Sequence, residues 1–451
     1  MSDFLAKAPL FLVGLLFFSL PISVASGDFA AIFLIFTFLI ALAQKKATFE
    51  FNFLAKAILI FALGFLISAL MSNDPVLSLA YVKKFWKFLL PFAVYWALKD
   101  KDLAPSLKWL VASSVGICIY SLVQYKTGLD VLRSASLQAE YVQHNGAWLA
   151  LGAFSHHLTF GGVCLLLFGL FLGLASESSP QRKYYILAAL LNLLAVFASH
   201  GRSSWLGAVV VLSVFIILRL PKRLAIVLGI LGLITVASLY SARNSDFIQQ
   251  HAIGKRLASA MNVNSNIDRL YMWEAGVDMI SDRPIFGFGA SKNEEMSPYY
   301  KAVAVRNRIT HGHKYKHVHE HKQKLIKNNR KMHTHEHNFQ HKPTTGVHNL
   351  YLQTWVNFGF LGFLAQFFWL FSIPVLLIKS YLEATAQTLD RRLEDKLMSG
   401  VKLGLAAGLL GSLFSGIFEN NFRDAEVQTV ILTFHGLGLI LLAQKHRKHN
   451  S

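Results

Sequence analysis

Long apolar runs, separated by short polar segments, dominate the pattern of this chain. A helix crosses a bilayer core with about 20 mostly apolar residues. Twelve candidate spans are predicted, at 9–26, 28–43, 51–71, 86–99, 107–124, 158–176, 184–199, 203–219, 224–241, 350–378, 400–418 and 427–444. The pattern therefore predicts an all-α polytopic integral membrane protein of about twelve transmembrane helices, with a large, partly helical outer loop between the ninth and tenth spans.

Composition supports this prediction and excludes a water-soluble chain of two or three domains. Of the 451 residues, 54% are hydrophobic, and the mean hydropathy is +0.42. Both cysteines, Cys118 and Cys164, lie inside apolar runs, which favours packing roles over a disulfide or a metal pair. An alternative interpretation of the first run is a secretory signal that ends near Ala25. A membrane span is favoured, because the leader has one lysine against one aspartate and a second apolar run follows at once.

Lysine and arginine in the short loops predict the orientation. Under the twelve-span pattern, the basic loops fall on one side, which is expected to be cytoplasmic together with both termini. These basic positions are Lys45, Lys46, Lys99, Lys101, Arg182, Lys183, Arg219, Lys222, Arg223, Arg391, Arg392 and the tail KHRKH. The exceptions are Lys83, Lys84 and Lys87, which form an amphipathic basic segment outside, before the fourth span. That segment suits contact with lipid or ligand phosphates, or simple solvation as a snorkelling face.

Three segments follow from this topology: spans one to nine at 1–241, a large outer loop at 242–348, and spans ten to twelve with a cytoplasmic tail at 349–451. Within the loop, 264–290 is expected to be helical and ordered, whereas 305–345, dense in His and Lys, is expected to be mobile. The helix has an apolar stripe and an N-cap candidate, Asp268, and is ended by a proline and two glycines. The stripe is Leu270, Trp273, Val277 and Ile280, and the terminating residues are Pro284, Gly287 and Gly289.

The histidines of 305–345 permit adventitious Zn²⁺ or Ni²⁺ binding. They alternate in HEH and HTHEH within a run dense in His and Lys, so incidental composition is favoured over a dedicated His-x3-His site with a carboxylate partner. No metal site is predicted.

Three cationic candidates lie at the outer ends of predicted helices. Arg202 precedes the eighth span, whose N-terminus, with Ser203 or Ser204 as the cap, directs free N–H groups and a positive dipole outward; this combination suits a phosphate. Arg269 begins the loop helix, one residue off its apolar stripe. His348 opens the tenth span, where the helix dipole disfavours the imidazolium, so a neutral ring is a candidate general base. The alternatives are a snorkelling arginine, a solvated arginine and an interfacial histidine anchor.

The motifs around these residues resemble those of the O-antigen ligase and polymerase superfamily of bacterial envelope glycosyltransferases. They are SHGRSSWLG (199–207), DRLYMWEAGVDMISDRPIFGFG (268–289) and VHNLYLQTWVNFGFLG (347–362), with HHLTFGG (156–162) as a weaker match. The resemblance implies transfer of a glycan from undecaprenyl diphosphate, at the periplasmic face, to an acceptor hydroxyl without a metal, cofactor or nucleotide sugar. The His- and Lys-rich insertion before His348 departs from the family pattern.

The resemblance also implies residue roles. Arg202 and Arg269 would bind the diphosphate, with Ser203 and Ser204 at the same helix end, and His348 would be the base. Two guanidiniums and a helix N-terminus suit an anionic leaving group. Secondary candidates are Lys83, Lys84, Tyr271 and Trp273, the two aromatics either lining a sugar subsite or packing.

The function predicted is an O-antigen ligase in the bacterial inner membrane. Its partners would be an undecaprenyl-diphosphate-linked glycan donor, a lipid A core acceptor and membrane lipid, with no nucleic acid. Rivals that share the donor are an O-antigen polymerase and a protein O-oligosaccharyltransferase. A rival of another class is a membrane transporter or metal-handling protein, which would need polar residues in broken helices at mid-membrane.

Overall fold

The computed structural model describes most of the chain. The described residues are 2–72, 74–133, 143–144, 147–177, 179–245, 248, 250, 252–260, 266–290, 300–301, 304, 346–387 and 393–449. The His- and Lys-rich stretch 305–345, expected to be mobile, lies outside them.

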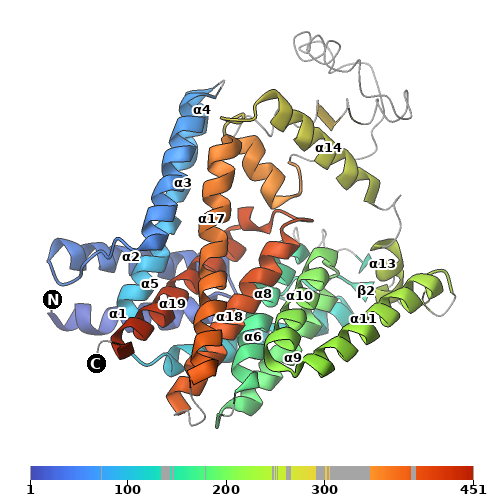
Figure 1. Ribbon diagram of the computed structural model, residues 1–451, viewed down its shortest axis with the longest axis horizontal. Coiled ribbons are helices and arrows are strands. Elements are labelled where there is room, and N and C mark those ends of the chain that lie inside the picture. Colours follow the sequence, from blue (N-terminus) through green and yellow to red (C-terminus); the bar gives the residue numbers. More distant parts are fainter. Residues whose placement is uncertain are drawn as a thin grey trace. The chain divides into compact units, whose positions relative to one another are not determined.

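Helices make up nearly all of the described secondary structure (Figure 1). They are α1 (Ser2–Ser19), α2 (Val24–Ala43), α3 (Phe53–Leu70), α4 (Pro75–Leu79), α5 (Leu90–Leu98), α6 (Ala104–Thr127), α8 (His157–Ser176), α9 (Arg182–Ala198), α10 (Arg202–Arg219), α11 (Lys222–Ala242), α13 (Ala252–Ala260), α14 (Ile267–Asp282), α17 (Leu350–Gln387), α18 (Leu393–Ser415) and α19 (Ala425–His449). Two 3₁₀ helices, η1 (Ala80–Leu89) and η4 (Asn421–Arg423), and an antiparallel pair, β1 (Gln143–His144) with β2 (Ala147–Trp148), complete the set.

A helix occupies each of the twelve apolar runs. Within the described ranges, nine helices are long and apolar enough to cross a membrane: α2, α3, α6, α8, α10, α11, α17, α18 and α19. The other three, α1, α5 and α9, are shorter in their apolar part. The nine residues of α5 rise only about 14 Å, less than half of a hydrocarbon core. The all-α polytopic membrane fold is therefore confirmed, and the count of twelve spans stays a prediction.

The contacts divide the chain into two compact units. Unit 1 comprises 1–55, 85–262 and 369–451, and unit 2 comprises 56–84 and 263–368. Both units draw on segments far apart in the sequence, and α17 belongs to unit 2 up to residue 368 and to unit 1 beyond it. The three sequence segments predicted above stay a prediction of topology.

Unit 1 is built around α8, the most deeply buried of its spanning helices. In Figure 1, α8, α10 and α18 lie side by side, and α8 and α18 approach each other through glycines. A Cβ on Gly173 would overlap the backbone of Gly400 and Gly404, and a Cβ on Gly404 would lie 2.6 Å from the carbonyl oxygen of Leu170. Because small residues let helix backbones approach closely in a membrane, these positions let the C-terminal half of α8 pack tightly against α18.

Unit 2 has its own apolar core. The core consists of Ala275, Met279, Phe288, Tyr300, Val347 and Val356, with Trp273, Ile280 and Leu352 packed against it. The buried face of α14 runs through Met272, Ala275, Gly276 and Met279. The predicted stripe was wrong at Val277, which is 52% exposed. Hydropathy alone did not mark Ala275 and Gly276, which are buried because α14 packs closely on Val347.

Residues 284–289, which follow α14, are hydrogen-bonded to residues 356–360 at a break in α17. This contact is called the clasp below. Gly359 has φ 66° and ψ −171°, so the helix is interrupted there. The N–H of Phe288 donates to Val356 O at 2.8 Å, and the N–H of Gly289 donates to Asn357 O at 3.0 Å. The N–H of Phe360 returns a hydrogen bond to Pro284 O at 2.9 Å. The clasp therefore satisfies backbone groups that the break in α17 would otherwise leave without helical partners.

Candidate active site

The SHGRSS turn leads directly into α10. Its residue His200 has a φ of 54°, which is unusual for a residue other than glycine. Gly201 is the N-cap and makes no side-chain cap, and the helix begins at Arg202. The prediction that Ser203 or Ser204 caps α10 was therefore wrong, because both lie inside its first turn. By helix geometry, the N–H groups of residues 202–204 precede the first intrahelical bond, from Trp205 N–H to Gly201 O at 3.0 Å. The helix end is thus a local concentration of N–H donors beside an arginine.

Two arginine side chains link helix α13 to this turn by hydrogen bonds. Arg202 Nη1 donates to the carbonyl oxygen of Ser259 at 3.1 Å, and Arg256 Nε donates to the carbonyl oxygen of His200 at 3.2 Å. Each arginine reaches the backbone of the other helix end. Arg256 was missed from the sequence, because nothing in its local pattern indicates that α13 returns to the start of α10.

The HHLTFGG turn begins α8 beside the same helix end. His157 Nδ1 lies 2.6 Å from Ser199 O, so this nitrogen carries the proton and donates to the carbonyl. A Cβ on Gly161 would lie 2.6 Å from Ser199 Oγ and 3.1 Å from Ser204 Oγ, so glycine is required where α8 meets α10. The weaker sequence match at this turn therefore corresponds to a physical contact with the SHGRSS turn.

The start of α8 also contacts the chain ahead of α19. Thr159 Oγ1 donates to Asp424 Oδ2 at 2.6 Å, and a Cβ on Gly162 would lie 3.0 Å from Asn421 Nδ2. The N-terminal ends of α8, α10 and α19 are consequently held together within unit 1.

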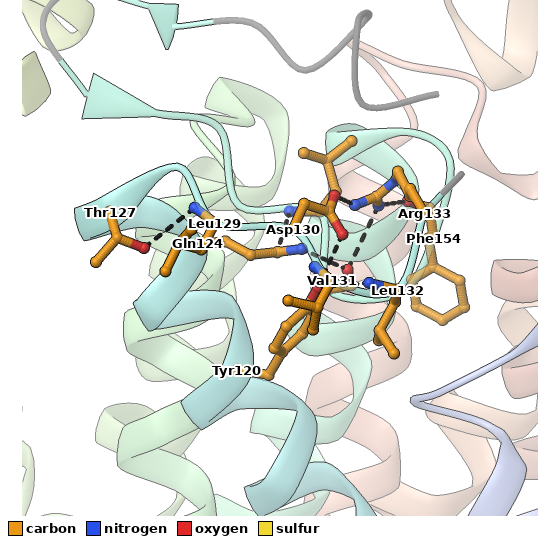
Figure 2. Close-up of polar contacts among 11 residues, drawn as sticks. Tyr120, Gln124, Thr127, Leu129, Asp130, Val131, Leu132, Arg133 and Phe154 are labelled. Atoms are coloured by element: carbon orange, nitrogen blue, oxygen red, sulfur yellow. Dashed lines mark hydrogen bonds and ion pairs between the residues drawn. The ribbon is translucent and has the colours of Figure 1, made fainter. Parts of the chain in front are cut away.

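A buried polar cluster holds the loop that leads into α8. Figure 2 shows Arg133 directed at Asp130 and at the carbonyl oxygen of Phe154, with Tyr120 donating to Asp130 Oδ1 at 2.8 Å. Gln124 donates through Nε2 to Gly152 O at 2.9 Å. The side chains of Asp130 and Arg133 are only 1% and 7% exposed. The cluster is therefore bonded to the backbone carbonyls of Gly152 and Phe154, just before His156 and His157.

In unit 2, His348 lies immediately before the cap of α17. Its φ is 48°, and the side chain is half-buried. Asn349 Oδ1 accepts from the N–H groups of Tyr351 at 2.9 Å and Leu352 at 3.0 Å, which makes Asn349 the capping residue. The N–H of Val347 donates to Gln353 Oε1 at 2.9 Å. Hydrogen bonds on both sides therefore define the backbone that carries the histidine.

Arg269 lies in the first turn of α14 and is half-buried. Asp268, predicted as the N-cap, is instead inside the helix and pairs with Lys301 at 3.5 Å, while Asn266 occupies the cap position. A Cβ on Gly276 would lie 2.6 Å from Val347 Cγ1, so α14 contacts the residue next to His348. Arg269 is seven residues, or about 10 Å along the helix axis, from that contact. Unit 2 thus carries Arg269 and His348 on elements that touch, together with Tyr271 and Trp273.

The basic segment before α5 divides into two kinds of lysine. Lys83 and Lys84 are exposed, and Lys84 Nζ lies 4.2 Å from the centre of the Tyr81 ring. Lys87, expected to be solvated or to contact phosphate, is buried. It donates to Asp28 Oδ1 at 2.7 Å and to Thr429 Oγ1 at 3.2 Å. That expectation was wrong for Lys87, because the amphipathic pattern of YVKKFWKF gives no sign of a carboxylate on α2.

The fold and these side chains define a polytopic α-helical membrane protein in which arginines and histidines gather at the starts of helices. The family model described as O-antigen ligase matches residues 187–321, a range that includes Arg202, Arg256 and Arg269. This match confirms the resemblance to the O-antigen ligase and polymerase superfamily. No curated protein matches the chain.

Proposed function

We propose that this protein is an O-antigen ligase that moves a polysaccharide from undecaprenyl diphosphate to a sugar hydroxyl of the lipid A core. The observation that carries the proposal is the start of α10, where Arg202 and the first-turn N–H groups lie inside the matched region. A helix N-terminus with guanidinium groups is suited to a diphosphate, and a diphosphate is the leaving group in this chemistry.

The proposed reaction is a single displacement at the anomeric carbon. The acceptor hydroxyl oxygen bonds to that carbon while the bond from carbon to the diphosphate oxygen breaks, and the electron pair leaves with undecaprenyl diphosphate. His348 takes the proton of the hydroxyl. Arg202 and Arg269 stabilise the charge that develops on the leaving group, and Ser203 and Ser204 belong to the same helix end. Attack opposite the departing diphosphate predicts inversion at the anomeric carbon.

The proposed setting is the inner membrane, with the site facing the periplasm and both termini in the cytoplasm. The positively charged short loops support this orientation. Glycosylated lipid donors, lipid A core and membrane lipid are the proposed partners.

Transfer from purified undecaprenyl-diphosphate glycan to rough lipopolysaccharide, in EDTA, tests the proposal. Wild type should transfer glycan, while Arg202→Ala, Arg269→Ala and His348→Ala should each reduce the rate at least 100-fold. Lys255→Ala, on α13, is the matched control and should retain wild-type activity.

The products separate the rivals that use the same donor. Glycan on lipid A core supports the ligase. Longer lipid-linked glycan without transfer to the core would indicate a polymerase, and glycan on serine or threonine of an added protein would indicate an oligosaccharyltransferase. A folded wild type that transfers nothing to any acceptor would overturn the proposal.

A further inference from the structure

We propose that a groove between α1 and α6 binds one phospholipid, with an acyl chain in the groove and a phosphoethanolamine headgroup at Lys101 and Asp102. The inference goes beyond the proposed function, because it concerns neither the glycan donor nor the acceptor. The chemical class of the ligand is a zwitterionic glycerophospholipid of the surrounding bilayer.

The shape of the groove suits an acyl chain. It has a volume of about 420 Å³, within the range of about 300–1,000 Å³ that is usual for ligand pockets. Its lining positions on α1 run from Leu10 to Phe18, which is about 12 Å along the helix axis. Phe11 and Trp109 line it and are 70% and 56% exposed. The groove is therefore apolar and open to the hydrocarbon around the protein.

Gly14 contributes space to the groove. The helices α1 and α6 pack against each other, and the ring centres of Phe18 and Trp109 are 6.0 Å apart. A Cβ on Gly14 would lie 3.6 Å from Trp109 Cδ1, which is an ordinary van der Waals distance. Close approach of the two backbones therefore does not require glycine here. The missing side chain instead leaves the groove open beside Trp109.

Two charged side chains line the groove where the chain enters α6. Asp102 Oδ1 accepts from the N–H of Ala104 at 2.9 Å, which holds this carboxylate at the helix start. Nearby, Lys99 is paired with Glu50 at 3.7 Å. The ammonium of Lys101 has no ion pair or side-chain hydrogen bond within the described part of the chain. The groove therefore offers one positive and one negative group to a ligand.

Charge complementarity selects the headgroup. Phosphatidylethanolamine carries one phosphate and one primary ammonium, so its phosphate complements Lys101 and its ammonium complements Asp102. Phosphatidylglycerol would bring a phosphate but no cation for Asp102, and diacylglycerol would bring neither charge. The predicted orientation places this end of α6 in the cytoplasmic leaflet.

Quenching of tryptophan fluorescence by brominated phosphatidylethanolamine tests the inference on the purified full-length protein in detergent. Because the chain has eight tryptophans, the part of the quenching that is lost in Trp109→Phe reports occupancy of the groove. Wild type should show saturable quenching that depends on Trp109. Brominated phosphatidylglycerol should bind about threefold to fivefold more weakly, as expected for one charge pair at an exposed position.

A variant that fills the groove tests its shape. Gly14→Leu should weaken binding about tenfold, because its side chain excludes roughly two methylene groups of the lipid. Gly116→Leu is the matched control on α6, since a Cβ at Gly116 would meet nothing within 4 Å and this residue does not line the groove. The control should be quenched like wild type.

Two charge variants test headgroup recognition without altering the apolar walls. Lys101→Gln should weaken the binding of both phospholipids about threefold to fivefold. Asp102→Asn keeps a capping acceptor for the N–H of Ala104 but removes the charge, so the preference for phosphatidylethanolamine over phosphatidylglycerol should disappear. Lys108→Gln is the control, because Lys108 is exposed on α6 and does not line this groove.

Three outcomes would overturn the inference. Equal Trp109-dependent quenching in Gly14→Leu and wild type would show that the lipid binds elsewhere. Equal binding of phosphatidylethanolamine and brominated diacylglycerol would show that the charged pair does not recognise a headgroup, and this comparison decides the question even if Gly14→Leu does not fold. Displacement of the phospholipid by equimolar undecaprenyl phosphate would assign the groove to a prenyl chain instead. None of these measurements uses glycan transfer, so they are independent of the ligase assignment.

Discussion

Replacing Gly359 with alanine should break the clasp of unit 2. At φ 66° and ψ −171°, this residue occupies a region that is essentially restricted to glycine. An added Cβ would also overlap the carbonyl oxygen of Ile285. The Gly359→Ala chain must therefore move either the break in α17 or the segment that follows α14.

The expected loss follows from the contacts. Forcing a non-glycine residue into this conformation costs about 1–3 kcal/mol. Displacing Ile285 would also disrupt three hydrogen bonds, namely Phe288 to Val356, Gly289 to Asn357 and Phe360 to Pro284, worth about 1 kcal/mol each. Together these effects predict a decrease of about 4–6 kcal/mol in the stability of the clasp.

Thermal unfolding in detergent, followed by tryptophan fluorescence, measures this decrease. Trp355 is a local reporter, because its Nε1 donates to Pro284 O at 2.9 Å. Gly229→Ala, in α11, is the matched control, since a Cβ there meets nothing within 4 Å. The control should unfold at the same temperature as wild type or at a slightly higher one. If Gly359→Ala unfolds at the same temperature as Gly229→Ala, the clasp does not have the role assigned to it.

Two more predictions concern buried polar contacts. Lys87→Met should lower the unfolding free energy by about 3 kcal/mol, because the carboxylate of Asp28 loses its counter-charge. Adding Asp28→Asn to this variant should recover part of that loss. If the two substitutions instead lower the thermal midpoint additively, the pairing is contradicted. Tyr300 donates to Asp282 at 2.6 Å, and burial, then Asp282, raise the pKa of the phenol. Its neutral form is therefore favoured in the folded state, and its contribution to stability is present below pH about 10 and decreases as the pH rises above that value. Tyr300→Phe should remove that part of the alkaline destabilisation, and an unchanged pH dependence of the midpoint would refute the assignment.

The sequence was most informative where a property depends on neighbours along the chain. Apolar runs predicted the positions of the helices, because a membrane span must satisfy its backbone within one segment. The motifs predicted the importance of Arg202, Arg269 and His348 as a set of candidates. Their convergence stays a prediction, since Arg202 belongs to unit 1 and the other two belong to unit 2.

The sequence was least informative where a residue depends on a distant partner. Lys87 reads as an exposed interfacial lysine until Asp28 is known to face it. Arg256 belongs to an unremarkable short helix until its contact with His200 O is seen. The exact helix starts were also missed: Ser203 and Asp268 are good capping residues by type, but the chain enters its helices at Gly201 and Asn266.

Both principal motifs hold a histidine in a strained backbone conformation just before a helix. His200 and His348 both have positive φ, at 54° and 48°, and each stands just before a helix. A non-glycine residue in this region is held at a cost of about 1–3 kcal/mol and persists only where surrounding contacts define it. The contacts differ but act on the same backbone: Arg256 binds His200 O, and Gln353 binds the N–H that precedes His348. Each strained histidine is therefore held at a helix N-terminus by another side chain. For His200 this is Arg256, from α13, and for His348 it is Gln353, one turn into α17. Gln353→Leu, which removes the acceptor for Val347 N–H, should therefore impair transfer through the position of His348 and lower kcat more than it raises either KM. A variant with unchanged kcat and a higher donor KM would show that Gln353 acts on binding instead.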